Sequence, residues 1–150
     1  MTNAPASDGP AIALVRTFYE AMSAGDLERL FPLLDPAVVV TQDPALPWGG
    51  RHVGHDGFAT FGLTLRSHIS SEVAIDAIFE ADDEVIQTGR TKGTVVSTGV
   101  PFDIAEVHRW TIRDGRAVAA HFAIDTPAML EALAADADAD VAAGPDDPAR

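Results

Sequence analysis

Two ionisable side chains lie two residues apart in a segment that otherwise has the pattern of an apolar strand. Residues 104–112 alternate, so Glu106, His108 and Trp110 share one face. A neutral imidazole accepts or delivers a proton near neutral pH, and a nearby carboxylate can orient it or raise its basicity. The spacing therefore predicts acid–base chemistry by His108 with Glu106 as its partner. The alternative is that the two side chains only satisfy each other, or a water molecule, in a half-polar wall.

A third candidate for catalysis, Asp43, lies in the segment TQDPALPWGG, whose prolines and glycines suit a loop at the rim of a cavity. Asp43 can supply a second carboxylate there, or it can simply form a turn. His52 and His55 are three residues apart, yet Gly54 lies between them and no third ligand is evident, so we predict no metal site. The chain has no cysteine, which excludes disulfides and thiolate chemistry. No cofactor is expected.

The apolar periodicity predicts helices first and strands afterwards. Helical spacing runs from Ile12 to Met22, resumes after Asp26 in a short helix that Pro32 should kink, and returns between Phe58 and Ile69. Such an order predicts an α+β domain in which three N-terminal helices cover one face of a curved, mostly antiparallel sheet. A pocket is expected between these layers. The predicted strands cover residues 38–40, 73–79, 84–97, 102–112 and 116–124, and a short C-terminal helix follows.

The turn of the last predicted hairpin decides which side chains share a face. The sequence Arg-Asp-Gly favours a three-residue loop with glycine in the left-handed conformation, which sets His108 opposite Ala120 and Glu106 opposite Phe122. The alternative is a two-residue Asp-Gly loop. This loop shifts the register by one and sets His108 opposite His121.

Length and composition predict one domain, because the chain has 150 residues and 47% of them are hydrophobic. The net charge of −13, with ten Lys and Arg residues in all, argues against binding to nucleic acid or an anionic membrane. No secretory signal pattern or membrane-spanning apolar run is present, so a cytoplasmic protein is expected. We predict a disordered N-terminal segment at 1–10, a domain at 11–133 and a flexible acidic tail at 134–150.

Three segments resemble the nuclear-transport-factor-2-like fold and, within it, the SnoaL-like group of polyketide cyclase and ketosteroid isomerase relatives. They are FYEAMSAGDLERLFPLLDPAVVV, PWGGRHVGHDGF, and EVHRWTIRDGR with AIDT after it. The resemblance spans residues 11–133. It implies a cone-shaped, cystatin-like fold, a pocket closed by the helices, a small hydrophobic ligand and a homodimer formed through the outer face of the sheet.

The catalytic residues of these relatives are only partly present. SnoaL-like cyclases resemble this chain in placing a polar residue and a histidine two apart on one strand. Their inward-facing aspartate on the final strand corresponds to Phe122 by our pairing, whereas Asp125 has the opposite parity and is predicted to cap a helix. The tyrosine on the first helix of ketosteroid isomerases matches Phe18, with Tyr19 one residue away. A simple steroid isomerase is therefore not supported.

Two functions remain open. The first is a cofactor-independent enzyme that cyclises or isomerises a small hydrophobic carbonyl compound, such as a polyketide or a steroid-like metabolite. The second is a non-catalytic ligand-binding or accessory dimeric domain, which the loss of the final-strand aspartate favours. A dimeric scaffold with a filled pocket is a third possibility. Large side chains expected to line the pocket are Phe18, Tyr19, Met22, Trp48, Phe58, Phe61, Trp110, Phe122 and Ile124.

Overall fold

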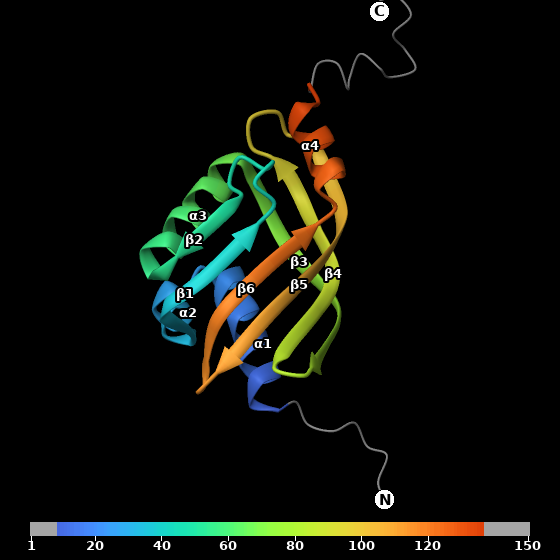
Figure 1. The fold of residues 1–150 in the computed structure, drawn as a ribbon. Helices are drawn as coiled ribbons and strands as arrows, with labels where there is room; N and C mark the ends of the chain where they lie inside the picture. The colour runs from blue at the N-terminus through green and yellow to red at the C-terminus, as the bar shows by residue number, and fades with distance from the viewer. Residues whose placement is uncertain (1–8, 137–150) are drawn as a thin grey trace, which may run out of the picture.

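The structure, a computed structural model, describes residues 9–136. Figure 1 shows a curved sheet with α1 and α3 packed against one face and α4 at one end. The predicted α+β architecture, with helices covering a curved sheet, is confirmed. The elements are α1 (Pro10–Ala24), α2 (Leu27–Leu30), the 3-10 helix η1 (Phe31–Leu33), β1 (Leu34–Gln42), β2 (Gly50–Val53), α3 (Gly54–His68), β3 (Ile69–Ala81), β4 (Glu84–Val95), β5 (Pro101–Arg113), β6 (Arg116–Ile124) and α4 (Thr126–Ala134).

Local sequence signals explain where the first helices begin and end. In α1 the buried positions Val15 and Phe18 are three residues apart, and Gly25 ends the helix in the left-handed conformation with φ of 69°. The side chain of Asp26 caps α2 by accepting a hydrogen bond from the backbone amide three residues on. Pro32, which lacks an amide donor, lies in η1, where the helical path tightens and stops before β1.

The six strands form one mixed sheet in the order β2-β1-β6-β5-β4-β3. β1 runs parallel to β6, and every other neighbouring pair is antiparallel. Along β5, exposed and buried residues alternate: Glu106, His108 and Trp110 are buried on the inner face, whereas Val107 and Arg109 are exposed on the outer face. The sheet therefore turns one carboxylate and one imidazole toward the helices.

The last hairpin differs from both registers expected from its sequence. The loop has two residues, Asp114 and Gly115, with φ of 50° and 76°, as in the tight turns that match the twist of a hairpin. An extra residue of β6, Val118, then forms a bulge. Because the bulge shifts the pairing by one more residue, His108 lies opposite Phe122. The predicted partners Ala120 and His121 were therefore wrong, and Glu106 faces Ile124 rather than Phe122.

Together, the two-residue loop and the bulge leave each side chain of β6 on the same face of the sheet as the predicted three-residue loop would have done. The turn moves the register by one residue and Val118 moves it by one more, so no side chain changes face. His108 and Phe122 therefore share the inner face, as expected, although they are direct neighbours across the ladder.

The long β3–β4 hairpin bends where the two backbones approach closely. A Cβ atom added to Gly89 would lie 2.1 Å from the carbonyl oxygen of Ala74 on β3. The pairing of β3 also shifts there, between Ile75 and Ala77. A bulge bends its strand and increases its twist, so this region helps to curve the sheet around the space beneath the helices.

The ends of the predicted domain lie close to the limits of the described residues. α1 begins at Pro10 and α4 ends at Ala134, next to the expected boundaries. The predicted N-terminal segment and acidic tail fall mostly outside residues 9–136. Within that range, no helix combines the length and the apolar character required to cross a membrane.

Candidate functional site

A cavity of about 490 Å³ lies between the helices and the inner face of the sheet. Aromatic and aliphatic side chains form most of its wall, and one edge of His108 faces it. Trp110, which we expected in the wall, is fully buried outside the lining. The other residues predicted to contact a ligand do line the cavity: Phe18, Tyr19, Met22, Trp48, Phe58, Phe61, Phe122 and Ile124.

Glu106 and His108 form a close pair in this wall. His108 Nε2 lies 2.6 Å from Glu106 Oε1, and the two side chains are 8% and 0% exposed. An ionised carboxylate only accepts hydrogen bonds. The Nε2–H group of His108 therefore donates a hydrogen bond to Glu106. Glu106 lies behind His108 and does not line the cavity, so it acts on a ligand only through the imidazole.

Tyr19 joins α1 to this pair. Its hydroxyl oxygen lies 2.6 Å from His108 Nδ1, and it accepts hydrogen bonds from Trp110 Nε1 and Gln87 Nε2, both at 3.1 Å. With the proton of His108 on Nε2, Nδ1 is the acceptor and Tyr19 is the donor. The result is a chain of hydrogen bonds from Tyr19 through His108 to Glu106.

Gln87 is a site residue that sequence reasoning missed. Its fully buried side chain lies on β4 directly opposite His108, and its Nε2 is 3.2 Å from both Glu106 Oε1 and His108 Nδ1. Its own Oε1 has no partner among the described residues, and neither does Glu106 Oε2. The available signal was the alternation of β4, which turns Val85, Gln87 and Gly89 to the inner face.

The enclosure of Tyr19 favours its neutral form. Burial raises the pKa of its hydroxyl above the ordinary value, and the negative charge of Glu106 adds to the rise. The hydrogen bonds from Gln87 and Trp110 lower the pKa, but by less. Tyr19 is therefore suited to donate a hydrogen bond rather than to act as a phenolate base.

The polar atoms of His108 and Tyr19 all have partners within this network. Both ring nitrogens of His108 are engaged, and the Tyr19 hydroxyl donates one hydrogen bond and accepts two. A polar ligand must therefore displace one of these bonds before it can exchange a proton with His108. Gln87 shares its amide among Tyr19, Glu106 and His108 at 3.1–3.2 Å, whereas Tyr19 and Glu106 both approach His108 to 2.6 Å.

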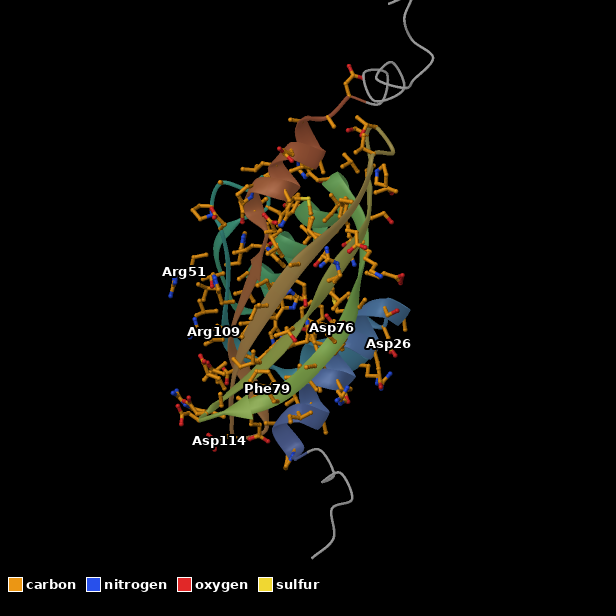
Figure 2. All side chains as sticks on the ribbon, turned by 90° about the vertical axis from the view of Figure 1, so that its right-hand side faces the viewer. Asp26, Arg51, Asp76, Phe79, Arg109 and Asp114 are labelled. Carbon is orange, nitrogen blue, oxygen red and sulfur yellow. The ribbon has the colours of Figure 1, made fainter. Side chains whose placement is uncertain are left out.

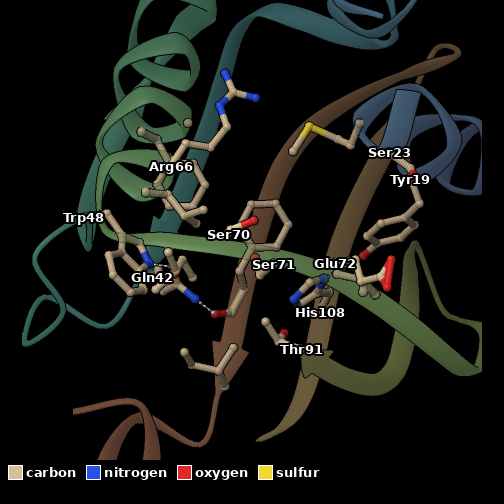
Figure 3. Close-up of a pocket in the computed structure, with 18 of the residues that line it drawn as sticks. Tyr19, Ser23, Gln42, Trp48, Arg66, Ser70, Ser71, Glu72, Thr91 and His108 are labelled. Atoms are coloured by element: carbon tan, nitrogen blue, oxygen red, sulfur yellow. Dashed lines mark hydrogen bonds between the residues drawn. The ribbon is translucent and has the colours of Figure 1, made fainter. Parts of the chain in front are cut away.

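Another part of the wall is fixed by Gln42 and Trp48 (Figure 3). Trp48 Nε1 donates to Gln42 Oε1 at 2.6 Å, and Gln42 Nε2 donates to the carbonyl oxygen of Phe122 at 2.7 Å. These bonds hold the indole against the cavity. The adjacent Asp43 is exposed and outside the lining, and its Oδ1 accepts a hydrogen bond from the amide of Ala45 in a turn. The structure thus does not bring Asp43 to His108.

Four other polar residues that could do chemistry are engaged elsewhere. His52 and His55 each donate from Nε2 to main-chain carbonyl oxygens, and residues 9–136 contain no group of three potential metal ligands among His, Cys, Asp and Glu. Arg90 pairs with an exposed aspartate on the outer face. Asp125 caps α4 by accepting from the amide of Ala128, as predicted. None of these side chains lines the cavity.

Comparison with known proteins agrees with this architecture. A structure of an NTF2-like protein of unknown function from Burkholderia pseudomallei K96243 is 28% identical, with a TM-score of 0.79 over 85% of this chain and 100% of that chain. TerC, crystallised with polyporic acid, is 23% identical, with a TM-score of 0.78 over 85% and 100% of the two chains. A protein from Pseudomonas putida KT2440, provisionally described as a polyketide cyclase, is 18% identical, with a TM-score of 0.73 over 85% and 100%.

The second and third of these likenesses concern the fold alone. No curated protein matches the chain at a significant level. The sequence model of the SnoaL-like domain matches residues 15–120, which include two thirds of α1, the whole of β5 and most of the cavity wall. The chain therefore belongs to the SnoaL-like family.

Proposed function

We propose that the chain catalyses a cofactor-independent proton transfer that cyclises or isomerises a small, largely apolar carbonyl compound, such as a polyketide or steroid-like metabolite. The observation that carries this proposal is the chain of hydrogen bonds from Tyr19 through His108 to Glu106 in the wall of an apolar cavity. The provisional description of a protein of the same fold as a polyketide cyclase gives further support.

In the proposed reaction the carbonyl oxygen of the substrate displaces His108 as the acceptor of the Tyr19 hydroxyl. Once the two hydrogens of Gln87 Nε2 go to Tyr19 and Glu106, the Nδ1 lone pair of His108 is free and removes a proton from the carbon next to the carbonyl. The C–H electron pair moves toward the carbonyl oxygen, where Tyr19 donates a hydrogen bond to the developing enolate. Glu106 stabilises the imidazolium through Nε2, at 2.6 Å.

The second half of the reaction consumes the enolate. In an isomerisation the imidazolium returns its proton to another carbon of the conjugated system. In a ring closure the enolate carbon attacks a second carbonyl group, and the imidazolium protonates the new alkoxide. Either path restores neutral His108 and needs no external oxidant or reductant. Phe61 and Phe122 stack with ring centroids 5.7 Å apart in the wall, which suits an apolar ring system.

A thermal-shift screen against polyketides, steroids, terpenoid epoxides and aromatic acids tests for a ligand, because a compound that prefers the native state raises the Tm. For a carbonyl compound that is turned over, His108→Asn is expected to lower kcat/KM by about 10²- to 10⁴-fold with binding retained. His121→Asn is the matched control, because His121 lies on β6 outside the cavity and bonds to Thr41. Unchanged turnover in His108→Asn would show that the catalytic assignment is wrong.

The alternative function is a ligand-binding domain without turnover. Two observations favour it: β6 carries no carboxylate, with Phe122 on its inner face, and both nitrogens of His108 are engaged. In that case ligands raise the Tm without being converted to product. His108→Asn then changes the affinity for the ligand, and no turnover is detected in either the wild type or the variant. Product analysis by mass spectrometry of each compound that raises the Tm distinguishes the two functions.

A further inference from the structure

The lining of the cavity includes one cation, Arg66 on α3. Within residues 9–136, its guanidinium makes no ion pair and no hydrogen bond. Four other arginines, at positions 29, 90, 109 and 113, pair with carboxylates. In a chain of net charge −13, an arginine that faces a cavity without a carboxylate partner is available to an anion from solution.

The helix holds Arg66 at the edge of the cavity. Gly62 is four residues earlier, so the two positions lie on the same side of α3, and both line the cavity. Gly62 has no side chain, and Arg66 Nη2 lies 4.0 Å from where a Cβ at Gly62 would be. The arginine side chain thus folds back toward the preceding turn, and the apolar Leu65 and Ile69 also line the cavity.

The charges around the cavity are arranged asymmetrically. Glu72 of β3 also lines it, and in the view of Figure 3 Glu72 and Arg66 lie on different sides of the drawn pocket. An anion is therefore disfavoured near His108, where the buried Glu106 carries negative charge. Beside Arg66 it is favoured, and a planar guanidinium binds a carboxylate through two parallel hydrogen bonds.

We propose that Arg66 binds the anionic end of an amphipathic ligand, so that the cavity takes an apolar ring compound that bears a carboxylate group. The ring body lies between the aromatic side chains, and the uncharged end of the ligand lies near His108. This inference rests on the proposed function in one respect: it names the substrate class for the same cavity. The orientation leaves a carbonyl group, rather than the carboxylate, within reach of Tyr19.

The test uses naphthalene carboxylate and naphthalene carboxamide, two probes that share ring and shape but differ in charge. Isothermal titration calorimetry of the whole chain is expected to show about tenfold tighter binding of the carboxylate. Arg66→Gln should abolish this preference and leave the affinity for the carboxamide unchanged. Arg66→Lys should keep part of it, because lysine retains the charge but lacks the planar pair of donors.

Arg51→Gln is the matched control, since it removes one positive charge from an exposed position on β2 outside the cavity (Figure 2). This variant should retain the preference. Added salt should reduce the preference in the wild type, because charges in contact with solvent are screened. Equal affinity for the two probes, no binding of the carboxylate at millimolar concentration, or a preference that survives in Arg66→Gln would each overturn the proposal.

This inference and the proposed function can fail separately. If Arg66→Gln leaves the preference intact while His108→Asn loses turnover, the anion site is wrong and the catalytic proposal stands. If Arg66→Gln abolishes the preference while His108→Asn keeps full turnover, the anion site stands and the catalytic role of His108 is wrong. The Tm of each variant is measured first, and only variants with the Tm of the wild type are compared, so that a loss of folding is not mistaken for a loss of binding.

Discussion

Tyr19 connects the first helix to the acid–base pair, and it is the single tyrosine of the chain. Its neighbour Phe18 packs against Trp110 with ring centroids 4.5 Å apart, which fixes this turn of α1 against the sheet. The adjacent hydroxyl then lies between His108 and Gln87. A one-residue difference from the tyrosine position of ketosteroid isomerases thus still delivers a phenol to the inner face.

The raised pKa of Tyr19 leads to a prediction about alkaline pH. The folded-state pKa lies above the unfolded value of about 10, so the native state keeps a proton that the unfolded chain loses. The contribution to the free energy of unfolding is therefore fully present below about pH 10 and declines as the pH rises above it. Tyrosinate absorbance in the near ultraviolet reports Tyr19 alone, and we expect ionisation to coincide with unfolding.

Tyr19→Phe supplies the control for this titration. The variant lacks the group whose pKa shifts, so its stability should fall less steeply above about pH 10. Urea unfolding followed by circular dichroism at several alkaline pH values measures the difference. Ionisation of Tyr19 in the still-folded protein near its ordinary pKa would contradict the prediction.

The pair of Glu106 and His108 allows a second prediction at this scale. His108→Leu should destabilise the fold by about 1–3 kcal/mol, because it removes a buried hydrogen-bond donor from Glu106. The double variant Glu106→Leu with His108→Leu should cost less than the sum of the two single variants, since no buried carboxylate is left without its partner. Chemical denaturation of the four proteins gives the coupling energy. Strict additivity would show that the contact contributes nothing.

Among the elements, α4 begins where the local sequence predicts a helix N-terminus. Asp125 is followed by Thr126 and Pro127, and in the structure its side chain accepts a hydrogen bond from the amide of Ala128 at the start of the helix. Asp125→Ala should lower the free energy of unfolding by about 0.5–2 kcal/mol. Asp125→Asn, which also caps well, should lose much less. Thermal unfolding compares them, and equal Tm values for the two variants would contradict a capping role.

Two glycines of this protein should respond oppositely to alanine. Gly89 lies where β3 and β4 approach closely, so Gly89→Ala forces a Cβ to within 2.1 Å of a carbonyl oxygen and should cost about 1–3 kcal/mol or more. Gly62 lies inside α3, where an added Cβ would meet only Arg66 Nη2 at 4.0 Å, so Gly62→Ala should stabilise the protein by about 0.5–1 kcal/mol. Each variant is the control for the other in a urea titration. A neutral Gly89→Ala would mean that the hairpin relaxes.

At the scale of the whole molecule, the outer face of the sheet exposes large apolar side chains. Figure 2 marks Phe79 and Arg109, whose strands pair through Ile86, so they lie on the same outer face as Val107. Phe79 and Val107 are 46% and 41% exposed. We propose, in keeping with the resemblance stated above, that two copies of the chain associate through this face.

Sedimentation equilibrium tests this association. The wild type should have twice the mass of 15.8 kDa, and Val107→Glu should have the mass of one chain, because each interface would bury an unpaired carboxylate. Leu63→Glu is the matched control, since Leu63 is 65% exposed on α3 and lies away from the sheet. A monomeric wild type, or equal effects of the two variants, would contradict this interface.

Local patterns were sufficient to predict most elements of this fold and the inward face of β5, but they missed the short edge strand β2. Helical spacing, the cap at Asp26 and strand alternation are properties of neighbouring residues, and they predicted α1, α2 and the shared face of Glu106, His108 and Trp110. The resemblance to the SnoaL-like family, carried by similar local segments, predicted the arrangement of these elements. This part of the prediction was confirmed because it depends on short stretches of chain.

Contacts between distant strands and helices settled the rest. The bulge at Val118 depends on how β6 pairs with β5, so no count of turn residues revealed the register. Gln87 meets His108 because β4 and β5 are neighbours, and Tyr19 meets both because α1 crosses the sheet at that point. A hydrogen bond between residues 89 positions apart depends on the packing of whole elements, which local periodicity does not encode.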